Sequence, residues 1–127
     1  MFINVSNHPS ANWSKEQYRA ASQDGQVIDL LFPEIDPYAG REEIIELAQK
    51  YYSQISKITQ LQDLPTSDVT VMVSGEFTFT HHLVEQLLKV GYHVVSACTK
   101  RDASEKIAPD GSVIKTAKFV FVQFRAY

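Results

Sequence analysis

Apolar and polar residues follow two different periods along this chain, and the changes of period mark its strands and helices. The clearest case is residues 69–73, a nearly continuous apolar run of the kind found in parallel strands that are covered on both faces. From Phe79 to Val90 the apolar positions recur at helical spacing until Gly91, a residue type that commonly ends helices. Thr78 or Thr80 is expected to cap this helix at its start.

The same patterns predict four further strands and two further helices. The strands cover residues 2–5, 27–32, 93–98 and 118–124, and the helices begin at Ser14 and Arg41. Gln17 follows Ser14 at the spacing of a capping box. Pro109-Asp110-Gly111 predicts a tight turn near the end of the chain. Because the final strand is apolar on both faces, we expect it to be central or well covered.

The order of these elements predicts the fold class and the topology. Strands that alternate with helices favour parallel pairing through right-handed crossovers, with helices on both faces of the sheet. The length of 127 residues leaves room for one domain. We therefore predict a single α/β domain over residues 1–127, three-layered and Rossmann-like. Its mostly parallel five-stranded sheet should have the order 2-1-3-4-5 and end in a C-terminal hairpin.

Polar residues follow the carboxyl ends of the predicted parallel strands. Those ends meet at one edge of a sheet, and ligands of open α/β sheets bind there, so we expect one shared site. The candidate ligand-binding residues are Ser6, Asn7, Ser74, Gly75, Thr78, Thr99, Lys100 and Arg101. The strand order reverses between the first and third strands, which should place Asn7 and His8 opposite Gly75 and Glu76.

Two residues at this edge are candidates for catalysis. His8 could act as a general acid or base because the unperturbed pKa of histidine is about 6.5; the alternative is a histidine that bonds to loop carbonyls beside Pro9. Glu76 could bind a ribose hydroxyl or act as a catalytic carboxylate. Its alternative role is to compensate the helix N-terminus, and these two interpretations have equal weight.

Lys100 and Arg101 are the best candidates for phosphate contacts, since arginine suits bidentate binding of a phosphate. The alternative is a pair of solvated surface charges. The chain has no Walker sequence and no complete G-x-G-x-x-G pattern. His81 and His82 are adjacent on a helix and should point in different directions, so we expect no metal site and no cofactor.

Charge and composition exclude several classes of protein. The net charge of −3 argues against extended DNA or RNA binding, which needs a strongly basic face. The single cysteine, Cys98, cannot form an internal disulfide, so nothing indicates an oxidising compartment. No apolar run approaches the roughly 20 residues that span a bilayer. We therefore expect a cytoplasmic protein without membrane contact.

Two motifs carry a resemblance to a known family. The opening Asn4-Val5-Ser6-Asn7-His8-Pro9 with Trp13 and Gln17, and the turn Gly75-Glu76-Phe77-Thr78, resemble the small CRISPR-associated Rossmann-fold (CARF-type) proteins. The layout is most similar to the compact, ring-nuclease-like members. The resemblance covers the length and element order of the chain, whereas the sharp matches lie in the first loop.

The resemblance implies an antiviral-defence protein that binds a cyclic oligoadenylate as a homodimer, across its two-fold axis. Ring-cleaving members act without metal, by orienting a ribose 2′-hydroxyl in line with the neighbouring phosphate. His8 matches the histidine of the opening motif and would assist proton transfer, while Ser6 and Asn7 would bind phosphate or ribose. Glu76 departs from an anion-friendly turn and leaves the ligand pose open.

Two other functions stay open at the level of the sequence. One is a nucleoside or nucleotide hydrolase or transferase that uses Glu76 as nucleophile or base. The other is a non-catalytic nucleotide sensor that has the same crevice but no turnover. Incubation with cyclic tetra- and hexa-adenylate separates the three, because only the nuclease forms shortened linear products.

Overall fold

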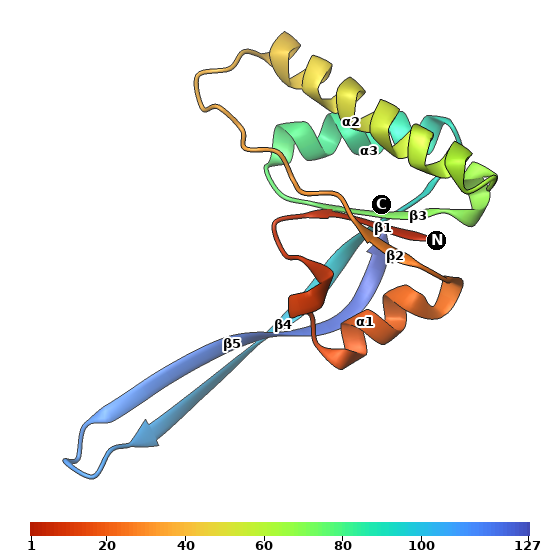
Figure 1. Ribbon diagram of the computed structural model, residues 1–127. Coiled ribbons are helices and arrows are strands. Elements are labelled where there is room, and N and C mark those ends of the chain that lie inside the picture. The colour runs from red at the N-terminus through yellow and green to blue at the C-terminus, as the bar shows by residue number, and fades with distance from the viewer.

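The computed structural model describes the backbone of residues 1–127 and every side chain except that of Asp24. The strands are β1 (Phe2–Ser6), β2 (Val27–Asp29), β3 (Thr70–Ser74), β4 (His93–Ile107) and β5 (Val113–Ala126). The helices are α1 (Lys15–Ala21), α2 (Arg41–Leu61) and α3 (Phe77–Lys89), with short 3-10 turns at Ser10–Asn12, Ser22–Asp24 and Thr66–Asp68. A long hairpin of β4 and β5 extends away from the rest of the chain (Figure 1).

The strands form one five-stranded sheet in the order β2-β1-β3-β4-β5, which confirms the predicted order. β1 pairs in parallel with β2 and β3, and β3 pairs in parallel with β4. β4 and β5 pair antiparallel, so the sheet is mixed, and the predicted C-terminal hairpin is present. Ser6 at the end of β1 lies opposite Ser74 at the end of β3.

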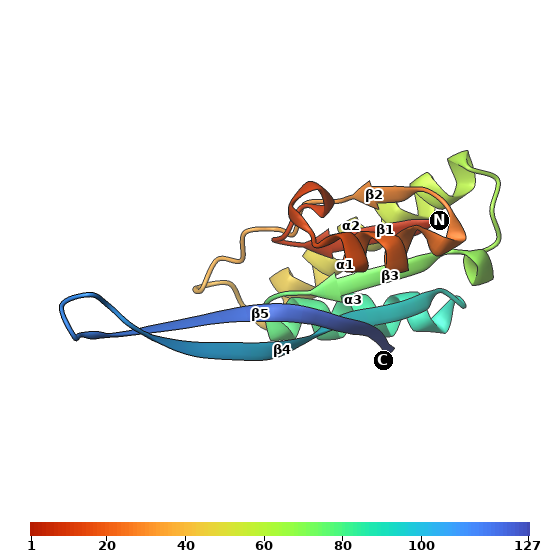
Figure 2. The same ribbon diagram turned by 90° about the horizontal axis from the view of Figure 1, so that it is seen from below.

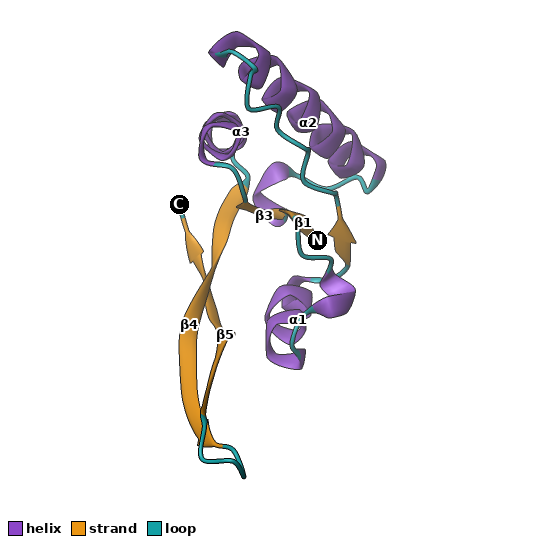
Figure 3. Cartoon of the chain, turned by 90° about the vertical axis from the view of Figure 1, so that its left-hand side faces the viewer, coloured by secondary structure: helices purple, strands orange, loops and turns teal.

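Helices cover both faces of the sheet. α2 and α3 lie against one face and α1 against the other (Figures 2 and 3). Because successive strand residues point to opposite faces, Ile3 belongs to the core under α2 and α3, while Phe2 packs with Ala21 of α1. By the same alternation Asn4 and Ser6 share the α1 face with Phe2. This face is therefore apolar where β1 begins and polar where it ends.

The helix starts agree only in part with the sequence patterns. Ser14 caps α1 as predicted, and its side chain accepts a hydrogen bond from the Gln17 N–H at 3.2 Å. The prediction that Thr78 or Thr80 caps α3 is wrong, because Glu76 is the N-cap and accepts from the N–H groups of Thr78 and Phe79. In the described part of the chain, no helix combines the length and the apolar character needed to span a bilayer.

β2 ends at Asp29, three residues before the predicted end at Phe32. The backbone N–H groups of Leu30 and Phe32 still donate to the carbonyls of Asn4 and Ser6, at 2.8 and 3.4 Å. The segment therefore stays extended beside β1. Pro33, which has no N–H to donate, follows this segment directly.

The prediction that the last strand is covered is wrong. β5 is an edge strand, and the side chains of Phe119 and Val122 on it are 74% and 57% exposed. β4 pairs with β3 only over His93–Val95, whereas β4 and β5 pair with each other out to Ile107 and Val113. Beyond the first residues of β4, the two strands therefore form a hairpin without a third strand beside them.

Candidate functional site

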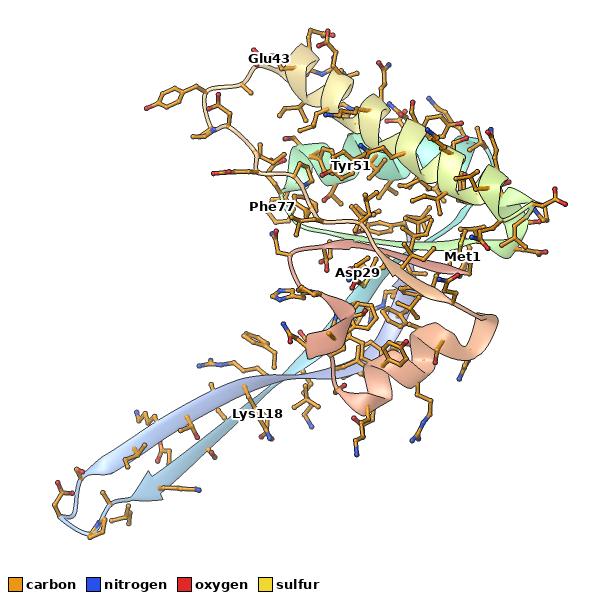
Figure 4. All side chains as sticks on the ribbon, in the orientation of Figure 1. Met1, Asp29, Glu43, Tyr51, Phe77 and Lys118 are labelled. Carbon is orange, nitrogen blue, oxygen red and sulfur yellow. The ribbon has the colours of Figure 1, made fainter. Side chains whose placement is uncertain are left out.

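An open groove lies on the α1 face of the sheet, at the carboxyl ends of β1 and β3. It has a volume of about 820 Å³ and two walls, the segment that leads from β1 into α1 and the base of the β4–β5 hairpin. Ser6 and Ser74 line the groove where β1 and β3 pair. Lys118, labelled in Figure 4, lies on the hairpin wall.

Asn4 fixes the first wall from inside the sheet. The residue is buried, and its Nδ2 donates to Oδ1 of Asp29 on β2 at 2.8 Å and to the His8 carbonyl at 2.9 Å. Its Oδ1 accepts a hydrogen bond from Oγ of Ser6 at 2.7 Å. One side chain thus ties the loop that follows β1 to both β1 and β2.

Further hydrogen bonds hold the same loop. The His8 carbonyl also accepts from Nε1 of Trp13 at 3.0 Å. The carboxylate of Asp29, labelled in Figure 4, accepts from the N–H and from Oγ of Ser10, the latter at 2.9 Å. The Trp13 ring lies against Phe2 with centroids 6.1 Å apart. Because these contacts involve the backbone as well as side chains, the loop is preorganised without a ligand.

The structure places the residues predicted at the end of the first strand in the groove. Ser6, Asn7 and His8 all line it. The Ser6 hydroxyl is buried and already bonded to Asn4, so Ser6 acts on the loop and offers little to a ligand. The side chains of Asn7 and His8 are exposed, and no described residue gives either a hydrogen bond. These two side chains are thus available to a bound molecule.

Only one of the residues predicted at the end of the third strand reaches the groove. Ser74 lines the groove, whereas Gly75, Glu76 and Thr78 do not belong to its lining. A Cβ added at Gly75 would overlap the ring of Phe32, so glycine is required there by packing. The two strand ends do meet as predicted, but the turn that follows β3 leads away from the groove and into α3.

The geometry of Glu76 matches its role at the helix N-terminus. Its carboxylate accepts hydrogen bonds from the Thr78 N–H at 3.0 Å, the Phe79 N–H at 2.8 Å and the Thr78 hydroxyl at 2.8 Å. Burial raises the pKa of Glu76, but the hydrogen bonds from Phe79 and Thr78 together outweigh it and lower the pKa below its usual value of 4.5. The carboxylate is therefore ionised at neutral pH and committed to capping.

Lys100 and Arg101 lie within β4 and not at its end. They stand opposite Val120 and Phe119 of β5, and adjacent strand residues point to opposite faces. Arg101 shares the face of Thr99, which lines the groove, while Lys100 is on the other face. The structure thus places the predicted pair on opposite faces of β4, and neither residue belongs to the lining of the groove.

Several residues of the groove were missed by the sequence patterns. They are mainly amide and aromatic side chains of the two walls: Asn12, Trp13, Gln17, Lys118, Phe119 and Phe121. Phe119 and Phe121 belong to the strand that was expected to be covered. Trp13 and Gln17 were named in the motif that carries the family resemblance, and Gln17 also in the capping box, but neither as a ligand-binding residue. The available signal was Asn4, a polar residue inside an apolar strand, which indicates a buried hydrogen-bond network at this position.

Comparison with protein families gives one match. Residues 1–125 match the uncharacterized protein MJ1673 family. The chain belongs to this MJ1673 family. Comparisons with curated proteins and with solved structures found no match.

The MJ1673-family chain also carries a His-His-Glu cluster on α3. The ligand atoms of His81, His82 and Glu85 lie within 4.8 Å of one another, so the two histidines do not diverge as the sequence argument expected. Glu85 also forms an ion pair with Lys89 at 3.3 Å. Among the described residues, no histidine, cysteine, aspartate or glutamate from a second element joins the cluster.

The groove of this MJ1673-family chain combines three kinds of contact. The exposed ring of Phe119 offers a flat surface for stacking, and Asn7 and Gln17 offer amide donors and acceptors. The imidazole of His8 adds a further hydrogen-bonding group, and Lys118 supplies a positive charge. The groove thus offers a bound molecule aromatic stacking, hydrogen bonds and one positive charge.

Proposed function

We propose that this chain binds an adenine nucleotide, specifically a cyclic oligoadenylate, in the groove between the loop after β1 and the hairpin. The observation that carries the proposal is that Asn7, Lys118 and Phe119 line the same groove. The groove lies where the strand order reverses, between β2-β1 on one side and β3 on the other. Ligands of Rossmann-like sheets bind at this reversal.

The chemistry of these groups suits adenine and phosphate. Stacking of a base on an aromatic ring contributes about 1–3 kcal/mol, and asparagine and glutamine amides can pair with N6 and N7 of adenine. Lys118 is positioned to offset the charge of a phosphate, and the Glu16 carboxylate, which also lines the groove, can accept from ribose hydroxyls. One wall thus supplies mainly hydrogen bonds and the other supplies stacking and charge.

A homodimer follows from the symmetry of the ligand. A cyclic oligoadenylate repeats the same nucleotide around a ring, and two copies related by a two-fold axis present the same groove twice. The resemblance of Asn4-Val5-Ser6-Asn7-His8-Pro9 to the compact CARF-type proteins supports this ligand. A role in CRISPR-associated antiviral defence, in the cytoplasm where such a messenger acts, belongs to the same proposal.

Cleavage of the ring is the second candidate function, and His8 favours it. The His8 ring is exposed in the groove and has no hydrogen-bond partner among the described residues. In this reaction the ribose 2′-oxygen attacks the adjacent phosphorus and gives its proton to His8. The P–O5′ bond breaks, which leaves a 2′,3′-cyclic phosphate on one end and a 5′-oxygen that takes a proton from water on the other. A third reading, a hydrolase based on Glu76, is disfavoured because that carboxylate caps α3 outside the groove.

The proposal is tested with purified protein and labelled cyclic tetra- and hexa-adenylate. We expect Phe119→Ala to weaken binding about tenfold, because the stacking ring is lost. Val122→Ala is the matched control, since Val122 is also an exposed apolar residue of β5 but lies outside the groove. The proposal fails if the wild-type protein binds neither ring, or if the two variants bind alike.

The same incubation decides between binding and cleavage. Chromatography should reveal linear products if the ring is cut, and His8→Ala should then lower the rate about 10²–10⁴-fold while binding stays within about tenfold. Undiminished cleavage by His8→Ala would remove His8 from the reaction. Binding without products would leave a nucleotide sensor.

A further inference from the structure

The β4–β5 hairpin from Thr99 to Phe121, here called the arm (residues 99–121), protrudes from the rest of the molecule. Every arm residue except Ala108 and Phe121 is exposed. Figures 1 and 3 show the arm leaving the body of the molecule, with neither a helix nor a third strand beside its outer half. The arm is thus the one long element that its own fold leaves uncovered.

The amino acids of the arm do not suit this exposure. Ile107, Val113 and Ile114 near its tip are 81%, 56% and 48% exposed, and Ile107 lies directly opposite Val113 in the hairpin. A two-stranded hairpin is only marginally stable in water unless another surface packs against it. Apolar side chains at the tip of such a hairpin therefore indicate a surface that lies outside this chain.

Charge identifies that surface. The arm holds five basic and three acidic residues, whereas the rest of the chain holds seven basic and twelve acidic residues. The arm and the body therefore carry opposite net charges of +2 and −5. Opposite charges favour the docking of one on the other.

We propose that the arm is a dimerisation arm that docks on the body of a second copy of this chain. Each copy has both a basic arm and an acidic body, so a two-fold pair satisfies both arms at once and closes the assembly. The proposal deepens the dimer part of the proposed function, but it does not need the nucleotide. Since Phe119 and Phe121 in the arm line the groove, docking also holds one groove wall in place.

Analytical ultracentrifugation without nucleotide tests the arm directly. The wild-type protein should sediment at twice the chain mass of 14.4 kDa. In the tipless variant an Asn-Gly turn replaces residues 104–116 and joins Ala103 to Ala117, which already face each other in the hairpin. This variant should keep the circular dichroism of the body and sediment as a monomer. A monomeric wild type, or a dimeric tipless variant, overturns the proposal.

A charge-reversal pair covers the case in which the tipless variant does not fold. Lys106→Glu on the arm should raise the dimer dissociation constant about tenfold. Lys57→Glu on α2 makes the same change of charge on the body and should shift it less than about threefold. Equal effects of the two changes would overturn docking by charge.

Nucleotide binding, measured on the same samples, keeps the two proposals separate. A wild-type monomer that binds cyclic tetra-adenylate would refute the arm and the homodimer, and would leave nucleotide binding in the groove standing. If the wild type is a dimer, the tipless variant is a monomer and neither binds a nucleotide, the arm proposal is supported and the proposed function is refuted.

Discussion

Replacement of the buried Asn4 by alanine should destabilise the protein, because it removes the hydrogen bonds that hold the loop wall of the groove to β1 and β2. Asn4 is 1% exposed and makes three side-chain hydrogen bonds, one of them to the Asp29 carboxylate. A hydrogen bond to a charged group contributes about 1.5–3 kcal/mol and a neutral one about 0.5–1.5 kcal/mol. Because Asp29 keeps its contacts with Ser10, we expect Asn4→Ala to lower the free energy of unfolding by about 3 kcal/mol. For a chain of this size that corresponds to a melting temperature about 10 °C lower.

Thermal melting and urea denaturation, each followed by circular dichroism, measure this loss. Asn12→Ala is the matched control: Asn12 also belongs to the loop wall, but its side chain is exposed and has no hydrogen bond within the described residues. It should change stability by less than about 0.5 kcal/mol, as exposed positions usually do. If Asn4→Ala lowers the free energy of unfolding by less than about 1 kcal/mol, the hydrogen bonds of Asn4 do not hold the loop. The claim that the loop wall is preorganised would then be wrong.

Two further substitutions test the turn after β3. Gly75→Ala makes a methyl group overlap the buried Phe32 ring, so it should lower the free energy of unfolding by about 1–3 kcal/mol. Adding Phe32→Leu should recover part of this loss. If the losses of the two substitutions simply add, the overlap is not the cause. Glu76→Gln should lower stability at pH 7 by about 0.5–2 kcal/mol through the weakened cap. Since the folded-state pKa of Glu76 lies below 4.5, this stabilisation is present above pH 4.5 and is lost as the pH falls through the folded-state value. A difference in melting temperature between wild type and Glu76→Gln that stays constant down to pH 3 would refute the assignment.

The arrangement of the sheet could be predicted because burial leaves a strong mark on the sequence. Val71 and Val73 are wholly buried in β3, and a strand covered on both faces has to be apolar throughout. Strands joined through helices are then restricted to parallel pairing with one handedness, and the observed order 2-1-3-4-5 is one of the few that this restriction allows. The meeting of Ser6 and Ser74 follows from the same rule.

The hairpin and the roles of single polar residues could not be predicted in this way. An apolar strand such as β5 has the same pattern whether its own chain or another molecule covers it, so Phe119 was assigned to the interior. Glu76 is a poor N-cap by residue preference, and its role depends on how β3 turns into α3. The part played by Asn4 depends on Asp29, which lies 25 residues away and becomes its neighbour only when β1 and β2 pair.

The two walls of the groove differ in what holds them, and this difference ties ligand binding to assembly. The loop wall is fixed by Asn4 and Asp29 within one chain, whereas the hairpin wall depends on two strands that lack a third beside them. If a second copy holds the arm, the Phe119 ring is ordered before a nucleotide binds. The entropy cost of ordering the ring then does not reduce the binding free energy of the nucleotide. Linkage then requires a reciprocal effect, in which the nucleotide tightens the dimer by the same factor by which the dimer tightens nucleotide binding. A factor clearly greater than one, and not the existence of either complex alone, is the signature of a groove whose hairpin wall is held by dimerisation.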